Sequence, residues 1–150
     1  MSAERNIFCL YADDIRHEVN GKVSLIGMYQ GGMNVAGPLP VQLPKLVVST
    51  YINTPLDQPF QEVSVDLMLN DQVLQNISPP AQSVKDMQDS VPQFADSHLI
   101  SMLMVLVLQP FNVTEEGRLY VKAHLDGKVL ESNALRVRVV DAIPEHPFMS

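Results

Sequence analysis

The chain has 150 residues, a net charge of −7 and a single cysteine, Cys9. This length suits one domain whose core needs no disulfide or metal for support. The acidic balance disfavours nonspecific binding to nucleic acid or anionic lipid, and one cysteine excludes an intrachain disulfide. Its place in the apolar run IFCLY predicts a buried small hydrophobe rather than a reactive thiol.

The N-terminal stretch MSAERN lacks the apolar region of a signal peptide. The longest apolar run, residues 99–108, has ten residues, whereas a transmembrane helix needs about 20. We therefore expect a protein of a reducing cytosol with no membrane partner.

From the N-terminus onward the dominant hydrophobic period is two, which is typical of half-buried antiparallel strands. Residues 6–12 and 45–52 are apolar on both sides and predict deeply buried strands. Asn20-Gly21 and Asp126-Gly127 predict two-residue hairpin turns, because a type I′ turn needs positive φ at both central positions. Clear alternation predicts further strands at 63–69, 118–125 and 135–140.

The first hairpin has a definite predicted register. With a two-residue turn at Asn20-Gly21, Asp14 faces Gly27 and Ile15 faces Ile26. A glycine inside a strand indicates a bulge or the close approach of another backbone, and we expect one of these at Gly27.

Charged side chains gather on the same hairpin. Asp14, Arg16 and Glu18 share one face as an acid-base-acid ladder, which suits an edge strand. The alternative is a metal site. Asp13 and Asp14 point to opposite faces of a strand, so ligands gather only if a short helix brings Asp14, His17 and Glu18 together. We favour the strand and expect no metal.

Residues 77–97 interrupt the strand pattern with three prolines and no sustained period. An irregular segment of this length is uncommon in a compact domain. Two interpretations stand equally: a functional or mobile excursion, and a long crossover between two sheets.

Residues 99–108, LISMLMVLVL, are apolar on both strand faces. We predict a strand, with a helix capped at Asp96 or Ser97 as the alternative. A central core strand is the first interpretation, and an interface with a partner or a second copy is the next, since methionine-rich surfaces adapt to partners. Candidate interface residues are Ile100, Met102, Met104, Leu106 and Phe148.

The second hairpin contains an internal conflict of register. A turn at Asp126-Gly127 places Lys122 opposite Glu131, but Leu130 and Leu135 cannot then both face inward along one regular strand. A bulge or a break at Ser132-Asn133 would supply the missing one-residue slip.

After that slip, Arg136 lies opposite Arg118 and Arg138 lies near Glu116. Two arginines face each other favourably only with an acid or anion between them. The first interpretation is a solvated face with Glu115 or Glu116 as counterion, and the second is an anion site. Candidate anion-binding residues are Arg118, Lys122, Arg136 and Arg138.

The string DDIRHEVNGKVSLIGMYQGG, Asp13 to Gly32, and LPKL, Leu43 to Leu46, resemble a family of small bacterial and bacteriophage proteins known only as a domain of unknown function. The resemblance implies a bacterial or phage source and a β-rich protein, and it carries over no catalytic residue. Separately, FNVTEEGRLYV resembles the entry into the F strand of immunoglobulin-like folds, with the tyrosine displaced to Tyr120.

We therefore predict an all-β fold: an antiparallel two-sheet, immunoglobulin-like sandwich of seven to nine strands with Greek-key links, spanning residues 1–142, followed by a tail at 143–150. No phosphate loop, nucleophile elbow or metal quartet is found, so we expect no enzyme and no cofactor. The expected function is a non-catalytic, phage- or prophage-related interaction module in the bacterial cytoplasm or a virion. It binds a protein partner or its own copies as a homo-oligomer, and no nucleic acid. The alternative is an anion- or small-molecule-binding protein with a sequestering or inhibitory role.

Overall fold

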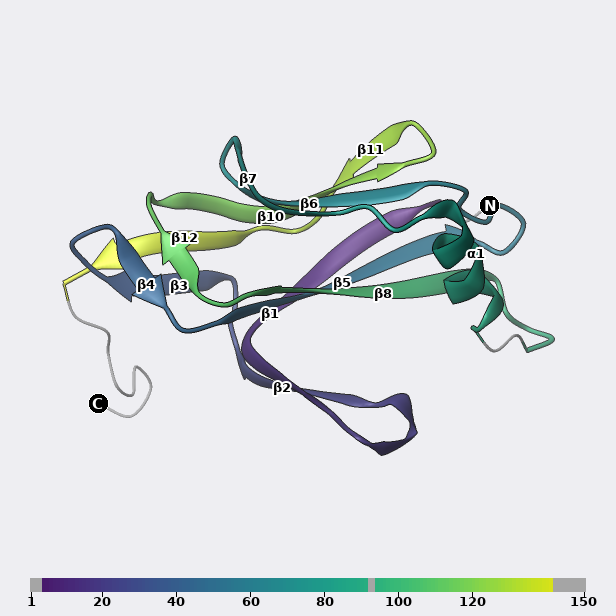
Figure 1. Cartoon of the computed structure of the whole chain (residues 1–150), viewed down its shortest axis with the longest axis horizontal. Helices are drawn as coiled ribbons and strands as arrows, with labels where there is room; N and C mark the ends of the chain where they lie inside the picture. The colour runs from purple at the N-terminus through teal and green to yellow at the C-terminus, as the bar shows by residue number, and fades with distance from the viewer. Residues whose placement is uncertain (1–3, 92–93, 142–150) are drawn as a thin grey trace.

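The structure of the chain is a computed structural model that describes residues 4–91 and 94–141. Within these ranges the chain is mostly β, with twelve strands and one α-helix, and its larger sheets are built chiefly of antiparallel pairs (Figure 1). The predicted tail at 143–150, which includes the candidate interface residue Phe148, lies outside the described residues.

The first sheet has four antiparallel strands in the order β2-β1-β5-β8. The strand prediction for residues 99–108 is confirmed, and this segment pairs with β5 as the strand β8. The strands are β1 (Asn6–His17), β2 (Val23–Met28), β5 (Leu46–Pro55) and β8 (Leu99–Leu108).

The second sheet has the order β3-β12-β10-β6-β7, and β11 also pairs with β10. β3 and β12 are parallel, so the expectation of a purely antiparallel fold was wrong at this edge. The chain leaves β2, crosses to the second sheet and enters β3 in the same direction as β12. The strands are β3 (Gly32–Ala36), β6 (Val63–Leu69), β7 (Gln72–Ile77), β10 (Gly117–Leu125), β11 (Lys128–Glu131) and β12 (Leu135–Val140).

A third, two-stranded sheet pairs β4 (Val41–Leu43) with β9 (Phe111–Val113). The described strands outnumber the seven to nine that we expected. The short strands β4, β9 and β11 account for the difference, because three or four residues carry too little alternation to be recognised.

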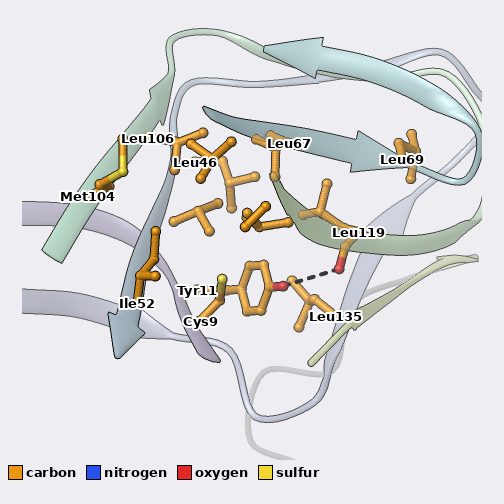
Figure 2. Packing of buried hydrophobic residues seen from close by; sticks show 14 of the residues in the cluster. Cys9, Tyr11, Leu46, Ile52, Leu67, Leu69, Met104, Leu106, Leu119 and Leu135 are labelled. Carbon is orange, nitrogen blue, oxygen red and sulfur yellow. Dashed lines mark hydrogen bonds between the residues drawn. The ribbon is translucent and has the colours of Figure 1, made fainter. Parts of the chain in front are cut away.

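The core lies between the two larger sheets and receives side chains from both (Figure 2). The predicted alternation is confirmed in β6 and β10, whose inward residues are fully or almost fully buried. Burying one such leucine or valine contributes about 1.5–3 kcal/mol relative to leaving it exposed. Tyr11 from β1 also reaches across, and its hydroxyl donates to the Leu119 carbonyl at 3.3 Å.

Cys9 is 2% exposed, as expected for a small buried hydrophobe. Its Sγ lies 3.5 Å from the Thr50 hydroxyl. Burial raises the pKa of the Cys9 thiol above its ordinary value, which disfavours the reactive thiolate.

The first hairpin forms, but its predicted register was wrong by one residue. The loop is a 3₁₀ turn of three residues, Val19–Gly21, closed by the Glu18 N–H donating to the Lys22 carbonyl at 2.8 Å. One extra loop residue shifts every pair, so that Asp14 lies opposite Ile26. Ile26 is therefore on the face of the charges and remains exposed.

Gly27 adopts a positive φ of 68° and lies against Asp13. A Cβ built on Gly27 would come within 2.4 Å of the Asp13 Oδ2 atom. The close approach that we predicted is therefore made by a side chain rather than by another backbone.

The slip predicted at Ser132-Asn133 is confirmed as a break between two strands. β10 pairs with β11 so that Lys122 faces Glu131, and it pairs with β12 in a register shifted by one residue. Leu130 and Leu135 can therefore both lie on the inner side, where Leu135 is buried and Leu130 packs against the core.

The segment that we left without secondary structure contains the helix α1 (Ala81–Asp89). The helix follows Pro79-Pro80, and Val84 and Gln88 are its buried residues. Val84 packs in the main core, so the helix covers one end of the space between the sheets.

Candidate interaction surface

Strand β8 sends alternate side chains to opposite faces of the first sheet. Four of the five candidate interface residues point inward and are at most 6% exposed, so they form the core rather than an interface. The physical reason is that the methionines fill the space between the sheets. These four residues are Ile100, Met102, Met104 and Leu106.

The opposite, outer face of the same sheet is also apolar, but part of it is open. Phe8, Tyr51 and Leu103 lie side by side across β1, β5 and β8, since Phe8 pairs with Tyr51 and Tyr51 pairs with Leu103. We call these three residues the outer row. Phe8 is 44% exposed and Leu103 is 39% exposed.

Two of the three residues of the outer row pack against each other. The rings of Phe8 and Tyr51 are stacked, with centroids 4.8 Å apart and planes within 8°. Stacked aromatic rings present a large apolar area with little side-chain freedom to lose on binding. An exposed apolar row of this kind is a feature of contact surfaces.

Polar residues border the outer row on one side. The next pairs along the three strands are Asn6 with Asn53 and Asn53 with Ser101, and the Asn53 amide donates to Asn6 Oδ1 at 2.7 Å. On the other side Ser49 is fully buried, and its hydroxyl has no hydrogen-bond partner in the described chain. The face is thus a narrow apolar band with one polar border.

The hairpin of β1 and β2 extends away from the rest of the chain (Figure 1, purple). The predicted charge ladder is confirmed in part, because Arg16 pairs with Glu18. Asp14 pairs instead with Lys45 at 2.6 Å, and this contact lowers the pKa of the Asp14 carboxyl.

Asp13 accepts a hydrogen bond from the Tyr29 hydroxyl. The segment is extended through His17, so the alternative of a short helix with gathered ligands was wrong. In the described ranges no group of three or more histidine, cysteine or acidic side chains is arranged to hold a metal ion.

The predicted basic residues do not form one site. Arg118 lies directly opposite Arg136, as predicted, and its guanidinium stacks over the Tyr120 ring at 4.4 Å. Lys122 is separate, because it lies between Glu131 and Asp66 in neighbouring strands.

Arg138 lies near Glu116, as predicted, but the Glu116 Oε1 accepts the Val139 N–H at 2.7 Å. Within the described chain Arg118 pairs with Glu131 at 3.8 Å, whereas Arg136 and Arg138 have no ion pair and are exposed. The remaining cluster consists of Arg118, Arg136 and Arg138.

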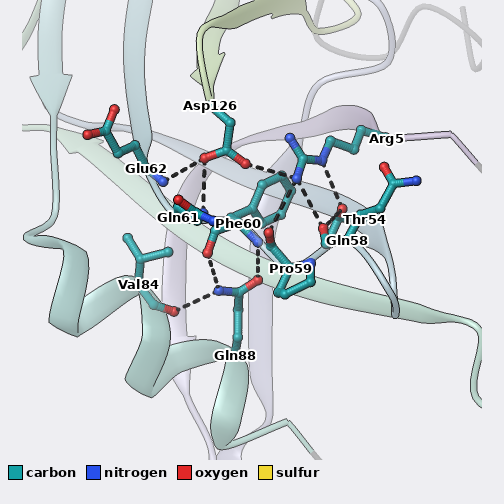
Figure 3. Close-up of polar contacts among 10 residues, drawn as sticks. All are labelled: Arg5, Thr54, Gln58, Pro59, Phe60, Gln61, Glu62, Val84, Gln88 and Asp126. Carbon is teal, nitrogen blue, oxygen red and sulfur yellow. Dashed lines mark hydrogen bonds and ion pairs between the residues drawn. The ribbon is translucent and has the colours of Figure 1, made fainter.

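A cavity of about 880 Å³ lies between α1 and the segment that follows β5. Its wall is fixed by Gln88, whose side-chain amide bonds both backbone groups of Phe60 at 2.6 and 2.8 Å (Figure 3). Six of the eleven lining residues are apolar, and the other five are Gln61, Gln82, Lys85, Gln88 and Asp89. The apolar lining residues are Leu56, Pro59, Phe60, Ala81, Val91 and Ile100.

Sequence reasoning missed this cavity because it missed the helix. The signal was present: Val84, Met87, Gln88 and Val91 follow the helical spacing i, i+3, i+4, i+7. The glutamine in that set hid the pattern, since a buried amide does not count as apolar.

The described chain is thus a mostly β protein with an open apolar row on one sheet and an arginine cluster on the other. It belongs to a family of unknown function, DUF6941, whose model matches residues 7–138. The resemblance found in the sequence is thereby confirmed. No curated protein matches the chain. The described residues include no helix with the length and apolarity needed to cross a membrane.

Proposed function

We propose that this protein is a non-catalytic interaction module that binds another protein chain through the outer row. The observation that carries the proposal is the line of Phe8, Tyr51 and Leu103 across three neighbouring strands, in which Phe8 and Leu103 are exposed and Tyr51 is half-buried. Large rigid aromatic side chains dominate the binding energy of many protein interfaces. The asparagine and serine border fits the polar rim that surrounds such a centre.

The same proposal includes the finer features expected from the sequence. The two layers around one core fit an immunoglobulin-like sandwich, and the resemblance of the first hairpin supports a bacterial or phage source. We accordingly propose a phage- or prophage-related protein that works in the bacterial cytoplasm or on a virion.

The experiment compares two baits in an extract of the native source. Phe8→Ser with Tyr51→Ser removes the stacked rings without touching the core. The matched control, Val129→Ser, removes an apolar side chain of similar exposure from β11. We expect a protein retained by the wild-type chain and by the control, but lost from the double variant. Identical sets on all three baits would contradict the proposal.

A second function is favoured by the arginine pair across β10 and β12. Arg118 and Arg136 face each other, and Arg138 lies two positions further along β12 on the same face. Arg118 pairs with Glu131 at 3.8 Å, so Arg136 and Arg138 are the guanidinium groups that remain for an anion in the described chain. Thermal unfolding with inorganic phosphate, citrate and ATP tests this. A ligand specific for the folded state raises the midpoint, and Arg136→Ala with Arg138→Ala should abolish the rise. No rise with any of the three anions would remove this alternative.

A further inference from the structure

Strand β8 is the last strand of the first sheet, so one of its edges has no neighbouring strand in the described chain. The hydrogen-bond pattern identifies which backbone groups lie there. Leu56 N–H donates to the His98 carbonyl at 3.0 Å and continues the β5–β8 ladder, in which Ile100 faces Thr54. Hydrogen-bonded pairs alternate in an antiparallel ladder, so the even-numbered residues of β8 bond to β5.

The odd-numbered residues of β8 therefore point their N–H and C=O groups to the open edge. The pairing of β1 leads to the same assignment. The Tyr29 N–H donates to the Tyr11 carbonyl, so the odd-numbered residues of β1 bond to β2 and its even-numbered residues bond to the odd-numbered residues of β5. The even-numbered residues of β5 therefore bond to β8. Among the described residues these outward groups have no hydrogen-bond partner. They belong to Leu99, Ser101, Leu103, Val105 and Val107.

This edge also lacks the features that usually protect an edge strand. β8 pairs with β5 through ten consecutive residue pairs without a register shift, and its sequence contains no charge and no proline. The opposite edge, β2, carries Gly27 in a positive-φ conformation against Asp13. β7, at the edge of the second sheet, is offset by a register shift at Leu67/Met68. A long, regular, apolar edge is a template for pairing with another strand.

We propose that the occupant of this edge is β8 of a second copy of the chain, paired antiparallel about a two-fold axis at Leu103. This inference rests on the proposed function, because it names a partner for the same sheet. In this register Leu103 faces Leu103 of the copy, Leu99 faces Val107, and Ser101 faces Val105. The five outward residues of each strand then form about ten hydrogen bonds.

The absence of charge on β8 permits a second copy here and gives a charged partner strand no counter-charge to pair with. The chain carries a net charge of −7, so two copies repel each other over most of their surfaces. β8 is a stretch of ten residues where identical strands can face each other without opposing like charges. A two-fold interface needs such a self-complementary surface.

The pairing also extends the outer row. Because Leu103 ends the row at the edge, the rows of the two copies meet there and form one line from Phe8 of one copy to Phe8 of the other. The eight-stranded sheet then presents a continuous apolar band, which is the surface that the proposed function assigns to a protein partner.

The test measures mass in solution by light scattering for the full-length chain and three variants. We expect the wild type to be a dimer, and Leu103→Lys and Leu103→Glu each to be monomeric, because like charges would face each other at the axis. An equimolar mixture of the two variants should regain the dimer mass, since Lys then faces Glu. The matched control, Val73→Lys, changes an exposed valine at the edge β7 and should remain dimeric.

Hydrogen exchange on the wild type supplies a readout that needs no variant. The amides of Ser101, Leu103 and Val105 should exchange slowly at high protein concentration and faster on dilution. The inference would be overturned by a wild type that is monomeric at high micromolar concentration. It would also be overturned if Val73→Lys dissociated the dimer while Leu103→Lys left it intact. A monomer that still retains a Phe8-dependent protein from the extract would refute the dimer alone and leave the proposed function standing.

Discussion

The side chain of Asn133 forms hydrogen bonds with both backbone polar groups of Cys9: its Oδ1 accepts the Cys9 N–H at 2.7 Å, and its Nδ2 donates to the Cys9 carbonyl at 3.0 Å. Cys9 lies on β1 beyond the reach of β2, whose pairing with β1 begins at Ala12. One amide therefore takes the place of a neighbouring strand residue. The Asn133 carbonyl, at 2.7 Å, is the nearer of the two acceptors that share the single Tyr11 hydroxyl proton, so the break between β11 and β12 is tied to the first sheet.

We predict that Asn133→Ala lowers the free energy of unfolding by about 2–4 kcal/mol, because it leaves two partly buried backbone groups without partners. Denaturant unfolding measures this. Asn34→Ala, at an exposed position of β3, is the control and should change stability by less than about 0.5 kcal/mol. Equal effects of the two substitutions would show that the Cys9 groups are satisfied by water instead.

A second prediction concerns Gln88, which pairs with both backbone groups of Phe60 as Asn133 does with Cys9. Gln88→Ala should destabilise the chain by about 1–3 kcal/mol, and it should speed hydrogen exchange at the Phe60 amide because it removes the acceptor of that N–H. Gln82→Ala, which removes only an exposed contact to Asp86, is the control. A Phe60 amide that exchanges at an unchanged rate would contradict the assigned role of Gln88.

Ser49 offers a stabilising substitution. Its hydroxyl is fully buried and has no hydrogen-bond partner in the described chain, so the folded state loses the hydration of this group without replacement. Ser49→Ala should raise the free energy of unfolding by about 1 kcal/mol. Thr50→Ala removes a neighbouring hydroxyl that does contact Cys9 and should not stabilise. A less stable Ser49→Ala chain would mean that the hydroxyl is hydrogen-bonded.

The fourth prediction is a dependence of stability on pH through Asp126. Desolvation alone would raise the pKa of this carboxyl, but the Glu62 and Gln61 N–H groups and the Arg5 guanidinium outweigh it and hold the pKa below its ordinary value. A carboxyl with a depressed folded-state pKa contributes stability above its unfolded pKa, about 3.9, and loses it as pH falls through the folded value.

Unfolding should therefore be measured from pH 7 downward for the wild type and Asp126→Asn. We expect the wild type to be more stable at neutral pH and the difference to shrink below about pH 4. Asp71→Asn, at an exposed position between β6 and β7, serves as control. A difference that is constant with pH would show that Asp126 acts only as a hydrogen-bond acceptor and not through its charge.

The strands could be predicted because alternation directly reflects burial on one face. The pairing of Arg118 with Arg136 could be predicted from two observations. Asp126-Gly127 fixes the turn, and Leu130 and Leu135 cannot both face the core along one regular strand, so the register must shift by one residue between them. The role of Asn133 could not be predicted, since its partner is a backbone far away in the sequence.

The errors share a different cause. Asn20-Gly21 fits a two-residue turn and also the three-residue turn that the structure contains, and the flanking residues do not distinguish them. The interface assignment on β8 failed because both faces of the strand are apolar. Only the position of the second sheet decides that Met102 points inward and Leu103 outward.

The position of β12 has a consequence for how the chain matures. β12 lies between β3, which precedes it by most of the sequence, and β10. A ribosome releases β3 long before its neighbour β12 exists, so β3 cannot join the rest of the second sheet until residues 135–140 emerge. During synthesis the edges of β3 and β10 that β12 will occupy therefore lack this partner. The second sheet is complete only when β12, the last described strand, pairs with both.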